Sequence, residues 1–459
     1  MSAQRSSYLP TRADMRGVVR LASPIVLIQV GMIAMGVVDS IMVGWISADA
    51  LAAVALGNVY SFGLTSFGLG TLLALDPVIA QALGAGDEPA VARGLQRGLL
   101  LAFLLGIPTS LGFLAVEPLL ALIQQPAEII PIAGGYVYRT MPGVFPFFVF
   151  IVLRQTLQAH RQTRDVLITI VLANAANVAL NYLWIYGKLG FPALGALGSA
   201  WSTLVCRWLM AALLLAFGWK YLAPYLKRLA DRVFDAGAML RMSRLGMPIG
   251  AQVFLEWAVF GTVAFLMGAF GTVQVAAHQV AINLASITFM VPVGISSAAA
   301  VIVGHAVGSG DLGRVRRSSV AALLVGIGFM ALMAVVFIGV PDVLAGIYTD
   351  HEAVLALAVL LLPIAGLFQV FDGAQAVSLG VLRGLGDTRA PMVIAILGFW
   401  LCGMPVSLWL AYGRGLGAVG LWWGLVAGLI AVATFLVLRI RHRLRRDIVR
   451  VQIDEPLPP

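Results

Sequence analysis

The sequence predicts an all-α integral membrane protein with twelve transmembrane helices, and two observations support this fold class. Of the 459 residues, 60% are hydrophobic and only 11% are charged, whereas soluble globular domains carry about 25% charged residues. The apolar residues also gather in runs of the length that crosses a bilayer, roughly 20 residues. Lipid leaves the backbone unsatisfied except in helices and closed barrels, and these runs are too long for barrel strands. A soluble domain is therefore excluded.

The apolar runs form two sets of six, separated by a polar, basic and amphipathic segment at residues 219–245. The first set covers residues 20–44, 51–81, 95–123, 131–158, 165–187 and 194–218. The second set covers residues 246–270, 275–307, 318–347, 354–384, 390–412 and 417–440. We expect an N-terminal lobe at 1–218, a linker at 219–245 that lies along the membrane surface, and a C-terminal lobe at 246–459.

Basic residues are divided unequally between alternate loops. Of the 30 Lys and Arg residues, 26 lie in segments on the same side as the N-terminus, and only Lys188 and Arg414 lie in the opposite loops. Arg139 and Arg207 fall within spans. Because an excess of Lys and Arg marks cytoplasmic loops, we expect both termini and the linker in the cytoplasm. This placement accounts for the net charge of +9 without a nucleic-acid partner.

The two halves repeat each other at a nearly constant offset of 224 residues. The sequence GAGD at residues 84–87 corresponds to GSGD at 308–311, and Arg93 corresponds to Arg317. Six helices per half is an even number, so both halves enter the membrane from the same side. They are therefore parallel repeats with a cleft between them, which is an architecture typical of transporters.

Three acidic residues lie well inside predicted spans, away from their ends: Asp39, Glu256 and Asp372. An ionised side chain at mid-bilayer costs roughly 2.5–3.5 kcal/mol even on the most lenient scale, so each is a functional candidate. The structural alternative is that they pair with Arg139 or Arg207 as packing contacts. At the corresponding positions of the other half stand Val263, Met32 and Phe147. Because the scaffold is duplicated and the acids are not, a role in function is favoured.

Depth groups the C-terminal acids into one predicted site. At about 1.5 Å per helical residue, Glu256 and Asp372 lie roughly 15–18 Å above the inner ends of their spans, so they can meet. Two carboxylates in one pocket suit reversible binding of a proton, of Na⁺ or of a cationic substrate.

A second predicted site lies in the N-terminal half. Asn177 and Asn181 are spaced i,i+4 and so share a helix face, and they lie at the depth of Asp39 and Thr203. One carboxylate with amide and hydroxyl oxygens can hold Na⁺ or a proton. The alternative for the Asn pair is hydrogen bonding between helices.

Other polar residues give weaker signals. Asn58, Gln279 and Asn283 either line the cleft or bridge helices. Asp76, beside Pro77, is expected to reach water at the inner end of its span. The two cysteines, Cys206 and Cys402, lie in different apolar runs, which argues against a disulfide.

Catalytic and cofactor motifs are missing from the sequence. There is no GxxxxGK[ST] phosphate loop, and no nucleophile elbow of the G-x-S-x-G type was identified. We expect no cofactor other than Na⁺ or H⁺ as coupling ion.

Several segments resemble the multidrug and toxic compound extrusion (MATE) family, in its NorM-type branch. They are SPIVLIQVGMIAMGVVDSIMVGW, FGLGTLLALDPVIAQALGAGD, MPIGAQVFLEWAVFG and FDGAQAVSLGVLRGLGDTRAPM. The resemblance covers essentially all twelve helices. It implies a secondary antiporter that exports bulky, often cationic, drugs in exchange for Na⁺ or H⁺. It also implies a location in the bacterial inner membrane, and we expect a monomer.

The resemblance extends to individual residues. Asp39 matches the family's first-helix acid, and Glu256 and Asp372 match its C-lobe cation site. The N-lobe polar positions fall on Asn177, Asn181 and Thr203. The sequence departs from the family at Phe368, a possible cleft residue where relatives often carry Tyr, and at Asp76, where relatives commonly have Thr.

Two other functions are kept as alternatives. A lipid-linked glycan flippase of the same superfamily would favour a cleft lined with Arg and Lys, and only Arg139 and Arg207 lie within spans away from the cytoplasmic ends. A membrane-embedded enzyme would need a catalytic cluster that the sequence does not contain.

Overall fold

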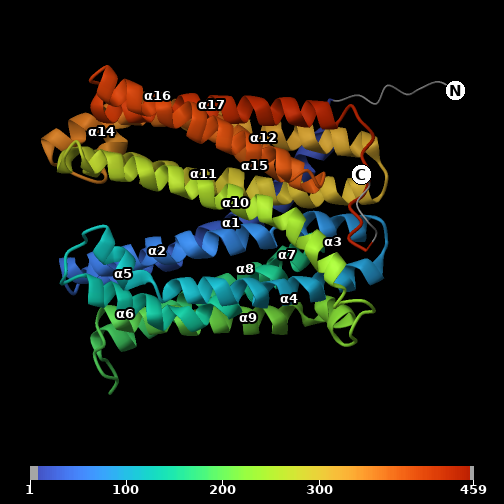
Figure 1. Cartoon of the computed structure of the whole chain (residues 1–459). Coiled ribbons are helices and arrows are strands. Elements are labelled where there is room, and N and C mark those ends of the chain that lie inside the picture. The colour runs from blue at the N-terminus through green and yellow to red at the C-terminus, as the bar shows by residue number, and fades with distance from the viewer. Residues whose placement is uncertain (1–8, 455–459) are drawn as a thin grey trace. The chain divides into compact units, whose positions relative to one another are not determined.

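The computed structural model describes residues 9–454, and every regular element in that range is helical (Figure 1). Twelve helical segments are long and apolar enough to cross a membrane. They are Arg12–Gly44, Ala48–Gly84, Glu88–Phe113, Ile130–Ala159, Thr163–Tyr186, Ala196–Leu226, Ala236–Gly268, Thr272–Gly308, Leu312–Gly339, Glu352–Gly384, Arg389–Gly413 and Gly417–Arg443. The predicted fold class, an all-α protein with twelve such segments, is confirmed.

The individual helices follow the chain in order. The first part contains α1 (Arg12–Gly44), α2 (Ala48–Leu72), α3 (Leu75–Gly84), α4 (Glu88–Phe113), α5 (Val116–Leu122), α6 (Ile130–Thr140), η1 (Met141–Gly143), α7 (Val144–Ala159), α8 (Thr163–Tyr186) and α9 (Ala196–Leu226). The remainder contains α10 (Ala236–Gly268), α11 (Thr272–Gly308), α12 (Leu312–Gly339), α13 (Pro341–Gly346), α14 (Glu352–Gly384), α15 (Arg389–Ala395), η2 (Ile396–Gly403), α16 (Met404–Leu408), η3 (Trp409–Gly413) and α17 (Gly417–Arg443).

The polar segment at the middle of the chain is largely helical. The helix α9 continues to Leu226 and α10 begins at Ala236, so only residues 227–235 lie between them. Asp235 caps α10, because its Oδ1 accepts a hydrogen bond from the backbone N–H of Ala238 at 3.0 Å. The same hydrogen bond lowers the pKa of Asp235, since it favours the ionised carboxylate.

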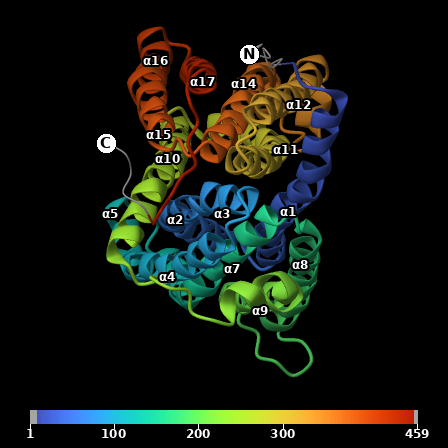
Figure 2. The same ribbon diagram turned by 90° about the vertical axis from the view of Figure 1, so that its right-hand side faces the viewer.

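The chain divides into two compact units. The first contains the described residues up to Val26, together with Ala80–Gly86 and Ala251–Val451, and the second contains Leu27–Ile79, Asp87–Gly250 and the residues from Gln452 onward. The helices α1, α3 and α10 therefore contribute residues to both units. In the second unit α7, α8 and α9 lie side by side (Figure 2).

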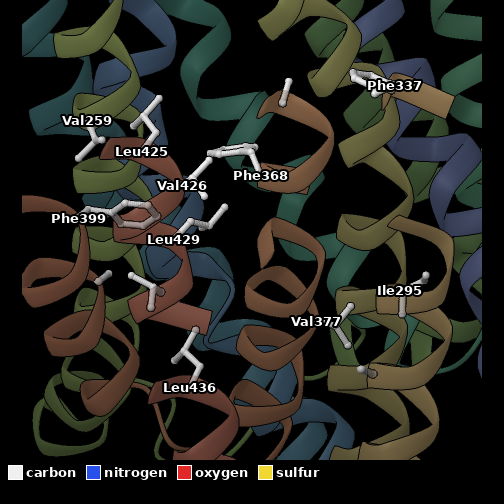
Figure 3. Packing of buried hydrophobic residues seen from close by; sticks show 14 of the residues in the cluster. Val259, Ile295, Phe337, Phe368, Val377, Phe399, Leu425, Val426, Leu429 and Leu436 are labelled. Carbon is white, nitrogen blue, oxygen red and sulfur yellow. The ribbon is translucent and has the colours of Figure 1, made fainter. Parts of the chain in front are cut away.

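The core of the first unit is built around α14, which packs against α11, α12 and α17. On α14, Val377 and Phe368 are buried in this core (Figure 3). Phe368 makes edge-on ring contacts with Phe260 at 6.1 Å and Trp422 at 5.8 Å between centroids. Ile295 of α11 and Leu429 of α17 belong to the same cluster. These helices are apolar on several faces, as expected for helices buried within a membrane bundle.

The sequence repeat produces the same turn in both halves. Gly86 and Gly310 have φ values of 69° and 72°, a left-handed conformation that glycine adopts without steric cost. The next residue then caps a helix: Asp87 accepts from Ala90 N at 3.1 Å and Asp311 from Arg314 N at 2.8 Å. Equivalent residues at the repeat offset therefore perform the same local task.

Glycine also permits a close approach between η2 and α17 in the first unit. A Cβ atom on Gly428 would lie 2.8 Å from the Cα of Gly403, and one on Gly403 would lie 3.0 Å from the Cα of Gly428. Backbones that come this close are typical of membrane helix pairs. Lipid provides no hydrophobic driving force between helices, and small residues allow close van der Waals packing instead.

We predict that Gly428→Ala destabilises the protein by about 1–3 kcal/mol, the usual cost of overpacking, because the new methyl meets backbone that has no side chain to rotate away. The control is Gly328→Ala on α12, where an added Cβ meets nothing within 4 Å. Thermal unfolding of the two purified variants in the same detergent tests this prediction. Equal midpoints for both would contradict it.

Candidate cation and substrate sites

Asp39 of α1 is held by side chains from two other helices of the second unit. Its Oδ1 accepts hydrogen bonds from Asn177 Nδ2 at 3.0 Å and from Asn181 Nδ2 at 2.6 Å, both on α8. Its Oδ2 accepts from Thr203 Oγ1 of α9 at 2.8 Å. Asp39 is only 2% exposed. The four residues that the sequence assigns to the N-terminal site therefore come together.

Two further buried oxygen atoms lie near Asp39. Asn181 Oδ1 has no hydrogen-bond partner, and Ser199 Oγ lies beside the Asp39 carboxylate. Buried polar groups are rarely left unpartnered without a reason. With the carboxylate and Thr203, they form an oxygen donor set that suits Na⁺ or a proton. No cluster of three or more His, Cys, Asp or Glu suited to a metal ion occurs within residues 9–454.

A buried tyrosine extends this polar group. The hydroxyl of Tyr136, which is 1% exposed, donates to Asn58 Oδ1 at 2.9 Å and lies near Thr203. The Asn58 side chain of α2 thus bridges to α6. Bridging helices is one of the two roles predicted for it. Tyr136 was not singled out from the sequence, because a tyrosine in a span is usually a packing or interface residue.

The two arginines within spans do not pair with the acids. Arg207 lies within electrostatic range of Asp39, but its guanidinium stacks over the Phe147 ring at 5.3 Å. Arg139 Nη1 donates to the backbone oxygen of Gly135 at 2.9 Å. Neither forms an ion pair in the part of the chain that the structure describes. The structural alternative, acids retained as partners of these arginines, is therefore not observed there.

The two C-terminal acids meet in the first unit. Glu256 of α10 accepts a hydrogen bond on Oε1 from Gln375 Nε2 of α14 at 2.6 Å. Gln375 is one turn from Asp372 on the same helix, and Asp372 lies within electrostatic range of Glu256. Glu256 is half-buried and Asp372 is 6% exposed. The predicted grouping of these two carboxylates agrees with this geometry.

The C-terminal site has fewer donors than the N-terminal one. Within residues 9–454 no side chain donates a hydrogen bond to Asp372, and Gln375 Oε1 is buried without a partner. Gln252, one turn before Glu256, is the second amide at this carboxylate. The site therefore offers two carboxylates and a free amide oxygen, an arrangement that can bind a cation.

The remaining candidate residues lie elsewhere in the first unit. Gln279 Nε2 donates to Asn283 Oδ1 at 2.8 Å on an exposed face of α11. Phe368 is 1% exposed and belongs to the hydrophobic core. Among the described residues, the side chains of Gln279 and Asn283 make no hydrogen bond to Glu256 or Asp372. Phe368 lies one turn before Asp372 on α14.

The prediction that Asp76 reaches water is wrong. The residue is 1% exposed, and its Oδ1 accepts a hydrogen bond from Gln155 Nε2 at 2.5 Å. The physical reason is that α3 begins at Leu75, so the helix break before Pro77 directs this carboxylate toward α7.

Comparison with known proteins identifies the family of this chain. The MatE family pattern matches residues 24–183 and 248–409. A protein named "Probable multidrug resistance protein NorM" from Rhizobium meliloti (strain 1021) is 36% identical over 453 residues, covering 97% of this chain and 96% of the relative. A protein of the same name from Mesorhizobium japonicum is 39% identical over 446 residues, covering 95% of both chains. The chain belongs to the MatE family.

Structural likeness supports the same assignment of fold. The crystal structure of the eukaryotic MATE transporter AtDTX14 matches with a TM-score of 0.86 at 22% identity, covering 94% of this chain and 98% of that one. The two MatE matches in this chain begin 224 residues apart, which is the offset of the internal repeat. MatE membership makes the protein a membrane transporter and not an enzyme, and the glycan flippase is not favoured.

Sequence reasoning missed the amide partners of the C-terminal MatE acids. Gln252 and Gln375 lie one turn from Glu256 and Asp372 in sequence, at spacings that place them on the same helix faces. This spacing is the signal that could have found them. Ser199, one turn before Thr203, could have been found in the same way.

We predict that Glu256→Gln and Asp372→Asn each lower the rate of substrate export at least about tenfold, because hydrogen bonds and contacts to charged groups contribute about 1.5–3 kcal/mol. Both changes keep the side-chain shape and leave expression normal. The control is Glu352→Gln, which alters an exposed acid at the start of α14. Initial rates of dye efflux from cells with matched protein levels measure the effect, and wild-type rates in both variants would refute the assignment.

Proposed function

We propose that this protein is a secondary active antiporter that exports amphipathic, often cationic, organic compounds in exchange for Na⁺ or H⁺. The observation that carries the proposal is Asp39, a carboxylate buried in a membrane helix and held by three neutral donors without an ion pair. The multidrug resistance named in the relatives supports the substrate class.

The chemistry of the N-terminal site suits coupling. An ionised Asp39 leaves a negative charge among neutral amides and a hydroxyl, and binding of Na⁺ or a proton neutralises that charge. A ligand shifts a conformational equilibrium only through its different affinities for the two states. The hydrogen bonds at Asp39 supply such a difference, since they exist only while three helices keep this arrangement.

The C-terminal carboxylates suit the substrate or a second cation. Glu256 and Asp372 place two acidic groups near each other with few donors to satisfy them. An organic cation gains charge-assisted contacts there. We assign no cofactor to the protein beyond the coupling ion.

We further propose that the protein is a monomer in the bacterial inner membrane, with an N-terminal lobe at 1–218, a linker at 219–245 and a C-terminal lobe at 246–459. The distribution of Lys and Arg, with 26 of 30 on one side, supports cytoplasmic termini.

The topology predicts how single cysteines react in a background that lacks Cys206 and Cys402. Ala85→Cys and Asp231→Cys lie in exposed, predicted cytoplasmic segments, so they should resist impermeant thiol reagents applied to intact cells. Lys188→Cys, in a predicted outer loop, should react promptly. Rapid external labelling at residue 231 would reverse the proposed orientation.

The role of Asp39 predicts a separation between binding and coupling. In Asp39→Asn the amide retains the shape of the side chain but removes the charge, so a fluorescent organic cation should still bind while ion-driven efflux falls by about 5–150-fold, the usual range of a coupling free energy. Equilibrium dye binding and efflux are measured in the same proteoliposomes, with Na⁺ and pH gradients imposed separately.

The control for this experiment is Asp49→Asn, which removes an exposed carboxylate at the start of α2 and should leave both quantities unchanged. Equal loss of binding and efflux in Asp39→Asn would make this residue a substrate contact or a folding residue. Unchanged efflux would assign it to packing.

A further inference from the structure

An apolar groove of about 220 Å³ lies between α4 and the segment that joins α9 to α10, within the second unit. Leu99, Leu100 and Phe103 of α4 form one wall. The other wall contains Leu226, Leu229 and Phe234. The transport sites described above use none of these residues.

The groove is held open by the amide of Gln96 on α4. Its Nε2 donates to the backbone oxygens of Tyr225 at 2.6 Å and Arg228 at 2.8 Å, and its Oε1 accepts from Ala230 N at 3.0 Å. The side chain is 8% exposed. These three bonds fix the segment above α4 and use the hydrogen-bonding groups of the amide, so the interior of the groove suits an apolar ligand.

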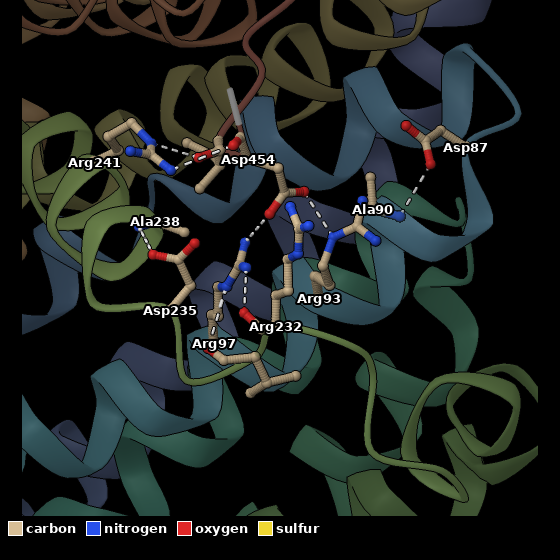
Figure 4. Close-up of polar contacts among 11 residues, drawn as sticks. Asp87, Ala90, Arg93, Arg97, Arg232, Asp235, Ala238, Arg241 and Asp454 are labelled. Atoms are coloured by element: carbon tan, nitrogen blue, oxygen red, sulfur yellow. Dashed lines mark hydrogen bonds and ion pairs between the residues drawn. The ribbon is translucent and has the colours of Figure 1, made fainter. Parts of the chain in front are cut away.

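Arg97 fixes the far end of the same segment and turns its charge away. Its Nη2 donates to Arg232 O at 2.6 Å and its Nε to Val233 O at 3.3 Å (Figure 4). Its Nη1 pairs with Asp454 at 2.7 Å. Asp454 also pairs with Arg93 at 2.6 Å. The Arg97 guanidinium is thus engaged by partners outside the groove, whose lining contains no charged residue.

The groove lies at the end of α9 and extends along α4 toward the apolar middle of its span. Leu226 is the last residue of α9, on the side that the basic residues assign to the cytoplasm. From Gln96 to Phe103 is about 10 Å along α4. Phe103 is 54% exposed, and Leu229 and Phe234 are each 69% exposed. Large apolar side chains left this open at the level of a bilayer are normally covered by lipid.

Basic residues alternate with the apolar ones in the segment that lines the groove. Lys227, Arg228 and Arg232 are exposed, and none forms an ion pair in the described range 9–454. Two acids lie in the same segment. Asp235 is engaged as the cap of α10, and Asp231 is exposed, so an excess of positive charge remains for an anionic partner.

We propose that the groove binds one acyl chain of an anionic phospholipid from the cytoplasmic leaflet, with its phosphate against Lys227, Arg228 and Arg232. Lipid tails are as apolar as Leu, so the chain alone gains little over bulk lipid. Selectivity therefore comes from the headgroup, at about fivefold for each Lys or Arg, which corresponds to about 1 kcal/mol.

Native mass spectrometry of the purified full-length protein tests this proposal, with phosphatidylglycerol and phosphatidylethanolamine of identical acyl chains added in separate titrations. The wild type should retain one phosphatidylglycerol, bound at least about fivefold more tightly than phosphatidylethanolamine. Lys227→Gln with Arg228→Gln should reduce this preference at least about fivefold, because only Arg232 remains. The matched control, Arg445→Gln with Arg446→Gln, neutralises two exposed arginines of the first unit and should keep it.

A second pair of variants tests the groove itself. Leu100→Trp fills it and should abolish the adduct, whereas Leu111→Trp, eleven residues further along the same face of α4 and 61% exposed, should retain it. Equal affinity for the two lipids, an adduct that persists in folded Leu100→Trp, or a dimer in place of the adduct would overturn the proposal. If Leu100→Trp does not yield folded protein, the charge variants decide.

Discussion

Asp39 determines how three helices of the second unit are arranged. In hydrocarbon no water can replace a missing donor, so the carboxylate must keep its hydrogen bonds from Asn177, Asn181 and Thr203. Two further contacts lie on the same seam between α1 and α8: Asn174 Nδ2 donates to Gly31 O at 2.9 Å, and the Tyr186 hydroxyl donates to Met42 O at 2.7 Å.

This seam places polar bonds on both sides of Asp39 along α1. A sliding motion of α1 past α8 by one helical turn, about 5.4 Å, would break all of them together. Side-chain bonds in membrane proteins contribute modestly one by one, but bonds that break together act as a unit. The acid and the helix register are therefore coupled, which is what a transport site that responds to an ion requires.

Much of this structure can be predicted from the sequence, for physical reasons that differ by feature. Hydropathy locates the spans because lipid tolerates only helices there, and the repeated Gly-Asp turns follow from backbone geometry at Gly86 and Gly310. The partners of Asp39 follow from depth, since helical rise converts residue number into height. Asn177 and Asn181 are spaced i,i+4 on α8, so both amides lie on the helix face that meets Asp39.

The features that sequence could not supply depend on side-chain direction. Asp76 is close enough to the predicted inner surface to reach water, yet it points toward Gln155, and only the path of the broken helix reveals this. Gln375 meets Glu256 across two helices. The groove beside Gln96 arises from hydrogen bonds to the backbone of an irregular segment. The periodic pattern of apolar residues does not predict such bonds.

The two acidic sites differ in the hydrogen bonds that a ligand affects. At Asp39 both carboxylate oxygens already accept hydrogen bonds, three in all, so one of the roughly four lone-pair positions of the carboxylate remains for a proton or for Na⁺. At Asp372 no side chain of the described residues donates a hydrogen bond. Neutralising Asp39 therefore weakens charge-assisted hydrogen bonds along the seam between α1 and α8, whereas neutralising Asp372 weakens none. Because only a ligand that changes the relative stability of two conformations can drive a transition between them, the coupling ion is better suited to Asp39 and the organic cation to the pair formed by Glu256 and Asp372.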